Sequence, residues 1–169
     1  MLWSRGFLAV FICLLLSGCG FTPVYAPKIT SSSGFSSIEI TNIPNSNGQY
    51  LRNVLMDKIY TNGRPLSAAY TLSVLSLNTV KNNIGVGKDA SVTRVQMRLG
   101  ASITLTDNAT GEKVLERDLR AFGGYNIFAG QYATMAATDA ATKWALDDLA
   151  GQITRELALY FDRQNGGAP

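Results

Sequence analysis

One stretch of this chain alternates strictly between apolar and polar side chains from position 95 to position 105. Successive residues of a β-strand point to opposite faces, so this pattern predicts a long strand with one buried face. The other face is polar and faces water or a polar partner. The apolar set is Val95, Met97, Leu99, Ala101, Ile103 and Leu105, and the polar set is Arg94, Gln96, Arg98, Ser102 and Thr104.

A strand and a helix are expected before this stretch. Residues 35–43 alternate around Ile38 and Ile40, which predicts a half-buried strand that Pro44 ends. Ser46 and Gln49 have the spacing of a capping box, with Ser46 as N-cap. An apolar stripe at helical spacing follows, and glycine and proline stop it: Leu51, Val54, Leu55 and Ile59, then Gly63 and Pro65.

Further strands and a long helix follow. Residues 70–77 predict a strand whose alternation shifts at Leu75, which indicates either a bulge or burial on both faces. Residues 82–89 are polar and glycine-rich and predict a hairpin loop, whereas 114–122 predict another strand. Residues 123–126 predict a break, and about 132–161 a helix with an alanine-rich first half. We expect Trp144 to lie in the core or on the sheet.

The order of elements is therefore β-α-β-β-β-α. It predicts an α+β fold with a four-stranded, mostly antiparallel sheet and two helices packed on one face. We assign residues 36–163 to this domain and 164–169 to a disordered tail.

The N-terminus has the features of a lipoprotein signal over residues 1–18. Arg5 precedes an apolar run over 6–16, which is too short to span a bilayer. Leu16-Ser17-Gly18-Cys19 resembles the bacterial lipobox, so we expect cleavage before Cys19, lipid on its thiol and a lipidated tether over 19–35. The alternatives are a chance cysteine after a secretory signal, or a short anchor helix. Gly20, rather than aspartate, favours the outer membrane in Gram-negative lipoproteins.

Composition excludes several kinds of chemistry. The chain has no histidine, which removes Ser-His and Cys-His nucleophile pairs and the commonest metal ligand. Its two cysteines are Cys13 in the signal and Cys19, so no disulfide is expected. The acids are scattered rather than convergent, and the small net charge of +3 gives no indication of nucleic-acid binding. We therefore expect that the protein is not an enzyme and that it binds neither a cofactor nor a metal ion.

Short motifs along the mature chain resemble the LptE family of lipopolysaccharide-assembly lipoproteins. Their order and spacing give the resemblance its weight. They are Gly20-Phe21-Thr22-Pro23-Val24-Tyr25 after the lipidated cysteine, Gln49-Tyr50-Leu51-Arg52-Asn53, Tyr70-x-Leu72-x-Val74, Thr93-Arg94, Tyr125-Asn126, Tyr132-Ala133 and Asp139-Ala140.

The resemblance implies a role and partners. LptE-like proteins are not enzymes; they occupy the lumen of the outer-membrane β-barrel LptD, help it assemble, and take part in lipopolysaccharide transport to the cell surface. The lipopolysaccharide contacts proposed for the family include basic residues near the hairpin loop predicted here over 82–89, which suggests Lys81, Lys88, Arg94 and Arg98. For each of these four residues, an equal alternative is that the side chain only keeps a loop or an exposed sheet face in contact with water. Candidate barrel contacts are Phe21, Pro23, Tyr25, Arg52 and Asn53.

Two other functions fit parts of the sequence. One is an envelope lipoprotein that serves as an auxiliary lipid-binding subunit of an ABC-type transport system. The other is a periplasmic hydrolase, which needs a convergent carboxylate pair. Co-purification distinguishes the first alternative from the barrel-plug prediction. A barrel plug should co-purify with a large outer-membrane barrel, and an auxiliary subunit with an inner-membrane permease.

Overall fold

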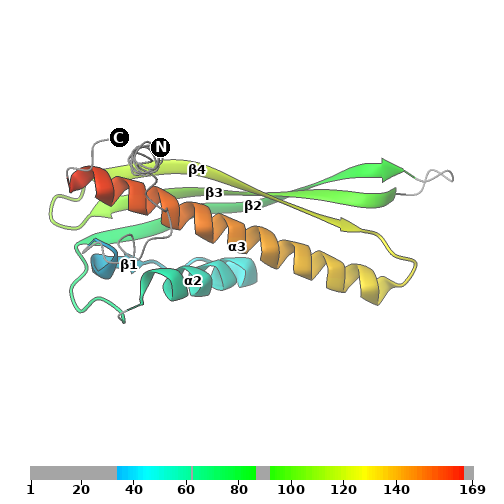
Figure 1. The fold of residues 1–169 in the computed structure, drawn as a ribbon, viewed down its shortest axis with the longest axis horizontal. Coiled ribbons are helices and arrows are strands. Elements are labelled where there is room, and N and C mark those ends of the chain that lie inside the picture. The colour runs from blue at the N-terminus through cyan, green and yellow to red at the C-terminus, as the bar shows by residue number, and fades with distance from the viewer. Residues whose placement is uncertain (1–33, 62, 87–91, 166–169) are drawn as a thin grey trace, which may run out of the picture.

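The computed structural model describes residues 34–61, 63–86 and 92–165 (Figure 1). A short 3-10 helix opens this part of the chain, and a sheet with two α-helices follows. In chain order the elements are η1 (Phe35–Ser37), β1 (Ile38–Ile40), α2 (Asn45–Ile59), β2 (Tyr70–Val86), β3 (Val92–Asp107), β4 (Lys113–Asn126) and α3 (Gln131–Gln164).

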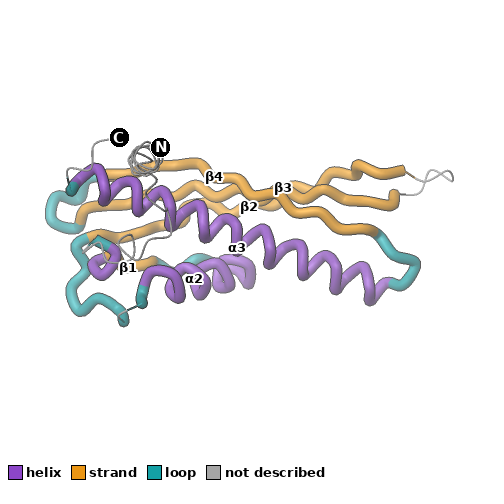
Figure 2. Tube along the Cα trace, in the orientation of Figure 1, coloured by secondary structure: helices purple, strands orange, loops and turns teal. Residues whose placement is uncertain are grey.

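The four strands form one sheet in the order β1-β2-β3-β4. β1 pairs with β2 in parallel, and the β2–β3 and β3–β4 pairs are antiparallel. Both helices cover the same face, and β2 and β3 extend well beyond β1 and α2 (Figure 2). The predicted α+β fold, with its mostly antiparallel sheet and helices on one face, is confirmed.

The core lies between the sheet and the two helices. All six apolar residues of the alternating stretch in β3 are at most 4% exposed, as the pattern predicts. Burying each of the larger ones contributes about 1.5–3 kcal/mol. All six except Val95 pack in one cluster with Leu51, Leu55 and Ile59 of α2 and with Leu146, Leu149, Ile153 and Leu157 of α3.

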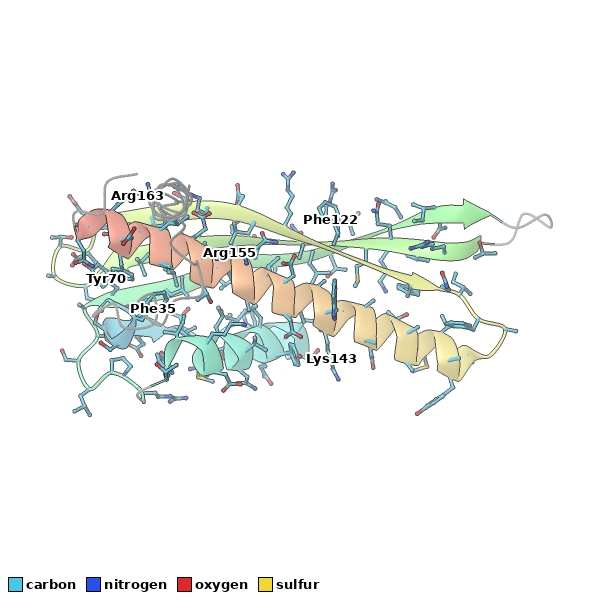
Figure 3. All side chains as sticks on the ribbon, viewed as in Figure 1. Phe35, Tyr70, Phe122, Lys143, Arg155 and Arg163 are labelled. Atoms are coloured by element: carbon cyan, nitrogen blue, oxygen red, sulfur yellow. The ribbon has the colours of Figure 1, made fainter. Side chains whose placement is uncertain are left out.

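Aromatic rings close the core at the end where the described chain begins. The Phe161 ring near the end of α3 lies 5.9 Å from Phe35 and 5.3 Å from Tyr70, centroid to centroid (Figure 3). Tyr160 packs edge-on against Tyr70. Phe35, which the sequence assigns to the tether, is 6% exposed and belongs to the core.

The first strand and the start of the first helix differ from prediction. The strand expected over 35–43 is reduced to β1, because η1 takes up its first part. The capping box is wrong: α2 begins at Asn45 with Pro44 as N-cap and no side-chain hydrogen bond. Asn45 has a φ of 70°, and a Cβ at Gly48 would lie 2.9 Å from the Ile43 carbonyl oxygen. Ser46 is therefore the second residue of the helix and does not cap it.

β2 confirms one prediction and corrects another. The register shifts between Val74 and Ser76, so Leu75 is the extra residue of a bulge, and its side chain is 61% exposed. The loop predicted over 82–89 is wrong for its first part. Asn82 pairs with Gln96 and Asn83 with Val95, so the strand continues to Val86. Pairing with β3 outweighs the low strand propensity of asparagine.

The predicted break at 123–126 is also wrong, because β4 continues through it to Asn126. Gly123 serves a different purpose there. A Cβ at this position would lie 2.9 Å from the Ala141 carbonyl oxygen, so the glycine lets α3 pass close over the strand.

The last helix runs from Gln131 to Gln164, a little longer than predicted, and takes in the first residue of the expected tail. The expectation for Trp144 is wrong, because this side chain is 74% exposed. Trp144 lies on the exposed side of α3 with Lys143 and Asp147, whereas the following Ala145 and Leu146 are buried. An ion pair between Arg117 Nε and Glu156 Oε2, at 3.3 Å, also joins β4 to α3.

Candidate functional site

The sheet face opposite the helices, here called the outer face, carries the most distinctive set of side chains. β3 supplies Arg94 and Arg98, which the sequence places on one face of a strand. Both are exposed, and the buried Val95, Met97 and Leu99 between and beside them point to the helices. The two arginines therefore lie together on the outer face, as predicted.

A third arginine joins them from the next strand. Arg120 of β4 lies opposite Gly100 of β3, two residues along the strand from Arg98. It is exposed, and its neighbour Ala121 is fully buried, which puts Arg120 on the outer face. Arg120 is not among the site residues predicted from the sequence, although the alternation around Ala121 in the predicted strand was a sufficient signal for it.

Apolar side chains lie among these cations. Arg98 is in register with Val80 of β2 on one side and with Phe122 of β4 on the other. Val80 is 40% and Phe122 56% exposed, and Figure 3 shows Phe122 on the opposite side of the molecule from Lys143 of α3. The outer face thus offers positive charge and accessible apolar surface in adjacent positions, an arrangement suited to an anionic amphiphile.

The other half of the outer face is different in charge. Ser76 donates to Ser102 at 3.2 Å, and Ser102 donates to the Asp118 carboxylate at 2.5 Å. Glu116 lies two residues further along the same face of β4, opposite Thr104. The outer face is therefore basic toward the β2–β3 tip and acidic toward the end with β1.

The remaining predicted lipid contacts do not join this group. Lys81 is paired with the buried Met97, so its side chain is on the helix side of the sheet, away from Arg94 and Arg98. Lys88 lies outside the described residues. So do Cys19 and the candidate barrel contacts Phe21, Pro23 and Tyr25.

The two candidate barrel contacts on α2 are placed differently from each other. Arg52 turns inward: its Nε donates to the Thr41 carbonyl at 3.2 Å and its guanidinium Nη2 to the Ile40 carbonyl at 3.4 Å. Asn53 is exposed. The structure thus gives Arg52 a role in holding α2 to the end of β1, and leaves Asn53 accessible.

The described part of the chain contains no group of three or more histidine, cysteine, aspartate or glutamate side chains arranged to hold a metal ion. Across the same described ranges, no helix combines the length and apolar character that crossing a bilayer requires.

Comparison with proteins of known structure identifies the fold as one found in bacterial lipoproteins. A candidate lipoprotein from Caulobacter crescentus is 26% identical and matches with a TM-score of 0.62, over 79% of this chain and 96% of its own. A minor lipoprotein from Acinetobacter baumannii is 27% identical, with a TM-score of 0.56 over 72% of this chain and 88% of its own. Rare lipoprotein B from Shewanella oneidensis shares the fold, at 11% identity and a TM-score of 0.60, over 76% of this chain and 97% of its own.

The model of the LptE family, described as lipopolysaccharide-assembly, matches residues 35–158. This chain belongs to the LptE family. The match covers every described strand and most of α3, so the resemblance carried by short motifs in the sequence is confirmed. A search of curated proteins finds no match.

Proposed function

We propose that this protein is a non-catalytic, outer-membrane lipoprotein that serves as plug and assembly partner of the LptD β-barrel in lipopolysaccharide transport. Membership in a lipopolysaccharide-assembly family supports the pathway. The lipobox at Cys19 supports attachment to a membrane by lipid, and Gly20 supports the outer membrane as its location. The barrel partner follows from the family alone.

The observation that carries direct contact with lipopolysaccharide is the basic half of the outer face. Arg94, Arg98 and Arg120 are exposed there on two neighbouring strands, on the sheet face that neither helix covers. Lipopolysaccharide combines phosphates with acyl chains. Arginine binds phosphate through paired N–H groups, while Val80 and Phe122 provide apolar surface beside Arg98.

Charge reversal tests this contact. In the detergent-solubilised full chain, Arg94→Glu with Arg98→Glu removes two cations and repels the phosphates, so binding of purified lipopolysaccharide should weaken about tenfold or more. The matched control is Lys143→Glu with Arg155→Glu, which makes the same charge change at two exposed positions of α3 (Figure 3). Equal affinity of the double mutant and the wild type would remove this face as the lipid contact.

The contacts within the domain reduce the number of candidate barrel-contact residues on α2 from two to one. Asn53 is exposed on α2 and remains a candidate, while Arg52 donates its hydrogen bonds within the domain. Phe21, Pro23 and Tyr25 remain candidates as part of the segment that joins the lipid to the domain. Photo-crosslinking groups placed at 53 and at 25 should both capture the barrel if these positions face it, whereas the buried position 55 should not.

A further inference from the structure

The fold protects most of its sheet edge with side chains. The outer side of β1 is sealed by α2: Tyr60 Oη accepts a hydrogen bond from the Ile40 N–H at 3.1 Å, and Arg52 donates to the Ile40 and Thr41 carbonyls. These contacts satisfy the backbone groups that an edge strand leaves free.

The opposite edge, β4, is covered by α3. Gln152 Nε2 donates to the Arg120 carbonyl at 3.0 Å, and the helix backbone at Ala141 lies against Gly123. Since α3 runs along this strand, a further strand has little access to it.

One long edge has no such cover. β1 pairs with Tyr70, Thr71 and Leu72 of β2 and with no later residue. Within the described residues, no loop, helix or side chain hydrogen-bonds to the free side of the β2 backbone over 74–86. Residues 76–83 of this strand pair without interruption with 95–102 of β3, so this part of the edge is regular.

The direction of the free groups follows from the register. The Thr41 N–H donates to the Leu72 carbonyl at 3.0 Å, so the backbone of Leu72 points toward the β1 side. The N–H and carbonyl groups of successive residues in a strand point alternately to its two sides. The one-residue bulge at Leu75 shifts this alternation by one residue. The residues that present an N–H and a carbonyl to the open side are therefore Leu77, Thr79, Lys81 and Asn83.

We propose that residues 76–83 of β2 bind an extended, acidic segment of a partner protein by strand addition. The charge around the edge decides the kind of segment. In β2 and in β3 up to Thr106, the charged residues are Lys81, Arg94 and Arg98, with no acid among them. A second copy of this chain would bring together six cations without a counter-charge, so an acidic partner fits and self-pairing does not.

This inference goes beyond the proposed function, because it concerns the edge rather than the outer face. Val80 and Ile84, which are 40% and 54% exposed, give the added strand apolar side chains to pack against. Backbone hydrogen bonds provide affinity in strand addition, and alternate side chains provide specificity.

The probe is a synthetic eight-residue peptide that alternates valine with glutamate, added to the detergent-solubilised full chain. Amide hydrogen exchange should slow at Leu77, Thr79, Lys81 and Asn83 when the peptide binds. The same peptide with alternate backbone nitrogens methylated, so that it lacks one row of donors, should give no protection. Unchanged exchange at these four amides with the unmodified peptide would overturn the proposal.

Thr79→Pro provides the matched variant. It removes an N–H that points to the open side, where proline is tolerated in an edge strand, so the β2–β3 ladder should persist. Peptide affinity should fall at least about tenfold, while binding of lipopolysaccharide stays at the wild-type level. Equal peptide affinity in both proteins contradicts strand addition, and so does protection of the edge amides by lipopolysaccharide in place of the peptide. Loss of lipopolysaccharide binding in the Arg94→Glu/Arg98→Glu protein is a separate result and tests only the proposed function.

Discussion

At the scale of single residues, Thr104 departs from the pattern around it. It belongs to the polar set of β3, yet its side chain is only 3% exposed, and its hydroxyl has no hydrogen-bond partner among the residues that the structure describes. A buried hydroxyl without a partner loses its hydration and gains nothing in return, which is unfavourable by about 1–3 kcal/mol.

Thr104→Val should therefore leave the free energy of unfolding unchanged or raise it by about 1 kcal/mol, since valine has nearly the same shape and no polar atom. Urea denaturation of the full chain measures this. The control is Thr106→Val, the next position on the same face, which is partly exposed. A loss of more than about 1 kcal/mol for Thr104→Val alone would show that the hydroxyl has a partner.

Residue positions were predictable where one periodicity holds. Strict alternation placed the whole buried row of β3 and the pair Arg94 and Arg98 correctly. It was insufficient for Lys81, because the bulge at Leu75 determines which face later residues of β2 occupy. Trp144 was misplaced because apolar character does not reveal how closely a helix approaches a sheet.

At the scale of elements, the α3–β4 contact depends on a glycine that sequence patterns interpret as a break. Gly123→Ala adds a Cβ 2.9 Å from the Ala141 carbonyl oxygen, and backbone on both sides has little freedom to move. Overpacking of this kind should lower the free energy of unfolding by about 1–3 kcal/mol.

Gly124→Ala is the control for that substitution, since its Cβ would lie at an ordinary 3.5 Å from the Val95 carbonyl oxygen. Urea denaturation of both variants should show a clearly larger loss at 123. If the two glycines tolerate alanine equally, close approach of α3 is not the reason for Gly123.

The two helices are joined by a hydrogen bond that alkaline pH should break. Tyr50 of α2 donates to the Asp147 carboxylate of α3 at 3.2 Å. Partial desolvation, and then the negative charge of Asp147 and this hydrogen bond, raise the pKa of Tyr50 above its ordinary value of 10.0. The folded state thus holds the phenol proton more tightly than the unfolded state, and this contribution to stability is lost as pH rises through the folded-state pKa.

Above about pH 10, the wild type should therefore lose stability more steeply than Tyr50→Phe. The unfolding midpoint, followed by circular dichroism from neutral to alkaline pH, measures the difference. Tyr132→Phe, which removes a hydroxyl from a side chain that is 85% exposed, should follow the wild type. Parallel curves for the wild type and Tyr50→Phe would show that the bond does not link the helices.

Element types were predictable, and their ends were less so. Every strand and helix expected from periodicity exists, because each has an apolar face that the core needs. The strand ends at 82–86 and 123–126 were missed because asparagine and glycine disfavour strands locally, while pairing with distant β3 residues overrides that preference. The open edge of β2 was also beyond prediction, since it depends on β1 ending at Ile40.

At the scale of the whole molecule, two regions differ in structure and in proposed role. One end of the molecule is formed by β1, α2 and the last part of α3 (Figure 1), and it holds the aromatic cluster and much of the core. The β2–β3 hairpin carries exposed cations, and it extends beyond both the short strand β1 and helix α2 (Figure 2). A lipid anchor at Cys19 would tether the first region, and the second would be free to meet the partner and the glycolipid.

The proposed function requires this protein to work inside a complex with an outer-membrane β-barrel. The most direct test is affinity purification of the full-length protein from outer membranes in mild detergent, followed by mass spectrometry of what remains bound. One large β-barrel, LptD, should be recovered in about equal amount, because a plug is enclosed by a single barrel. Recovery of the protein alone, or with an inner-membrane permease in place of a barrel, would contradict the proposed function.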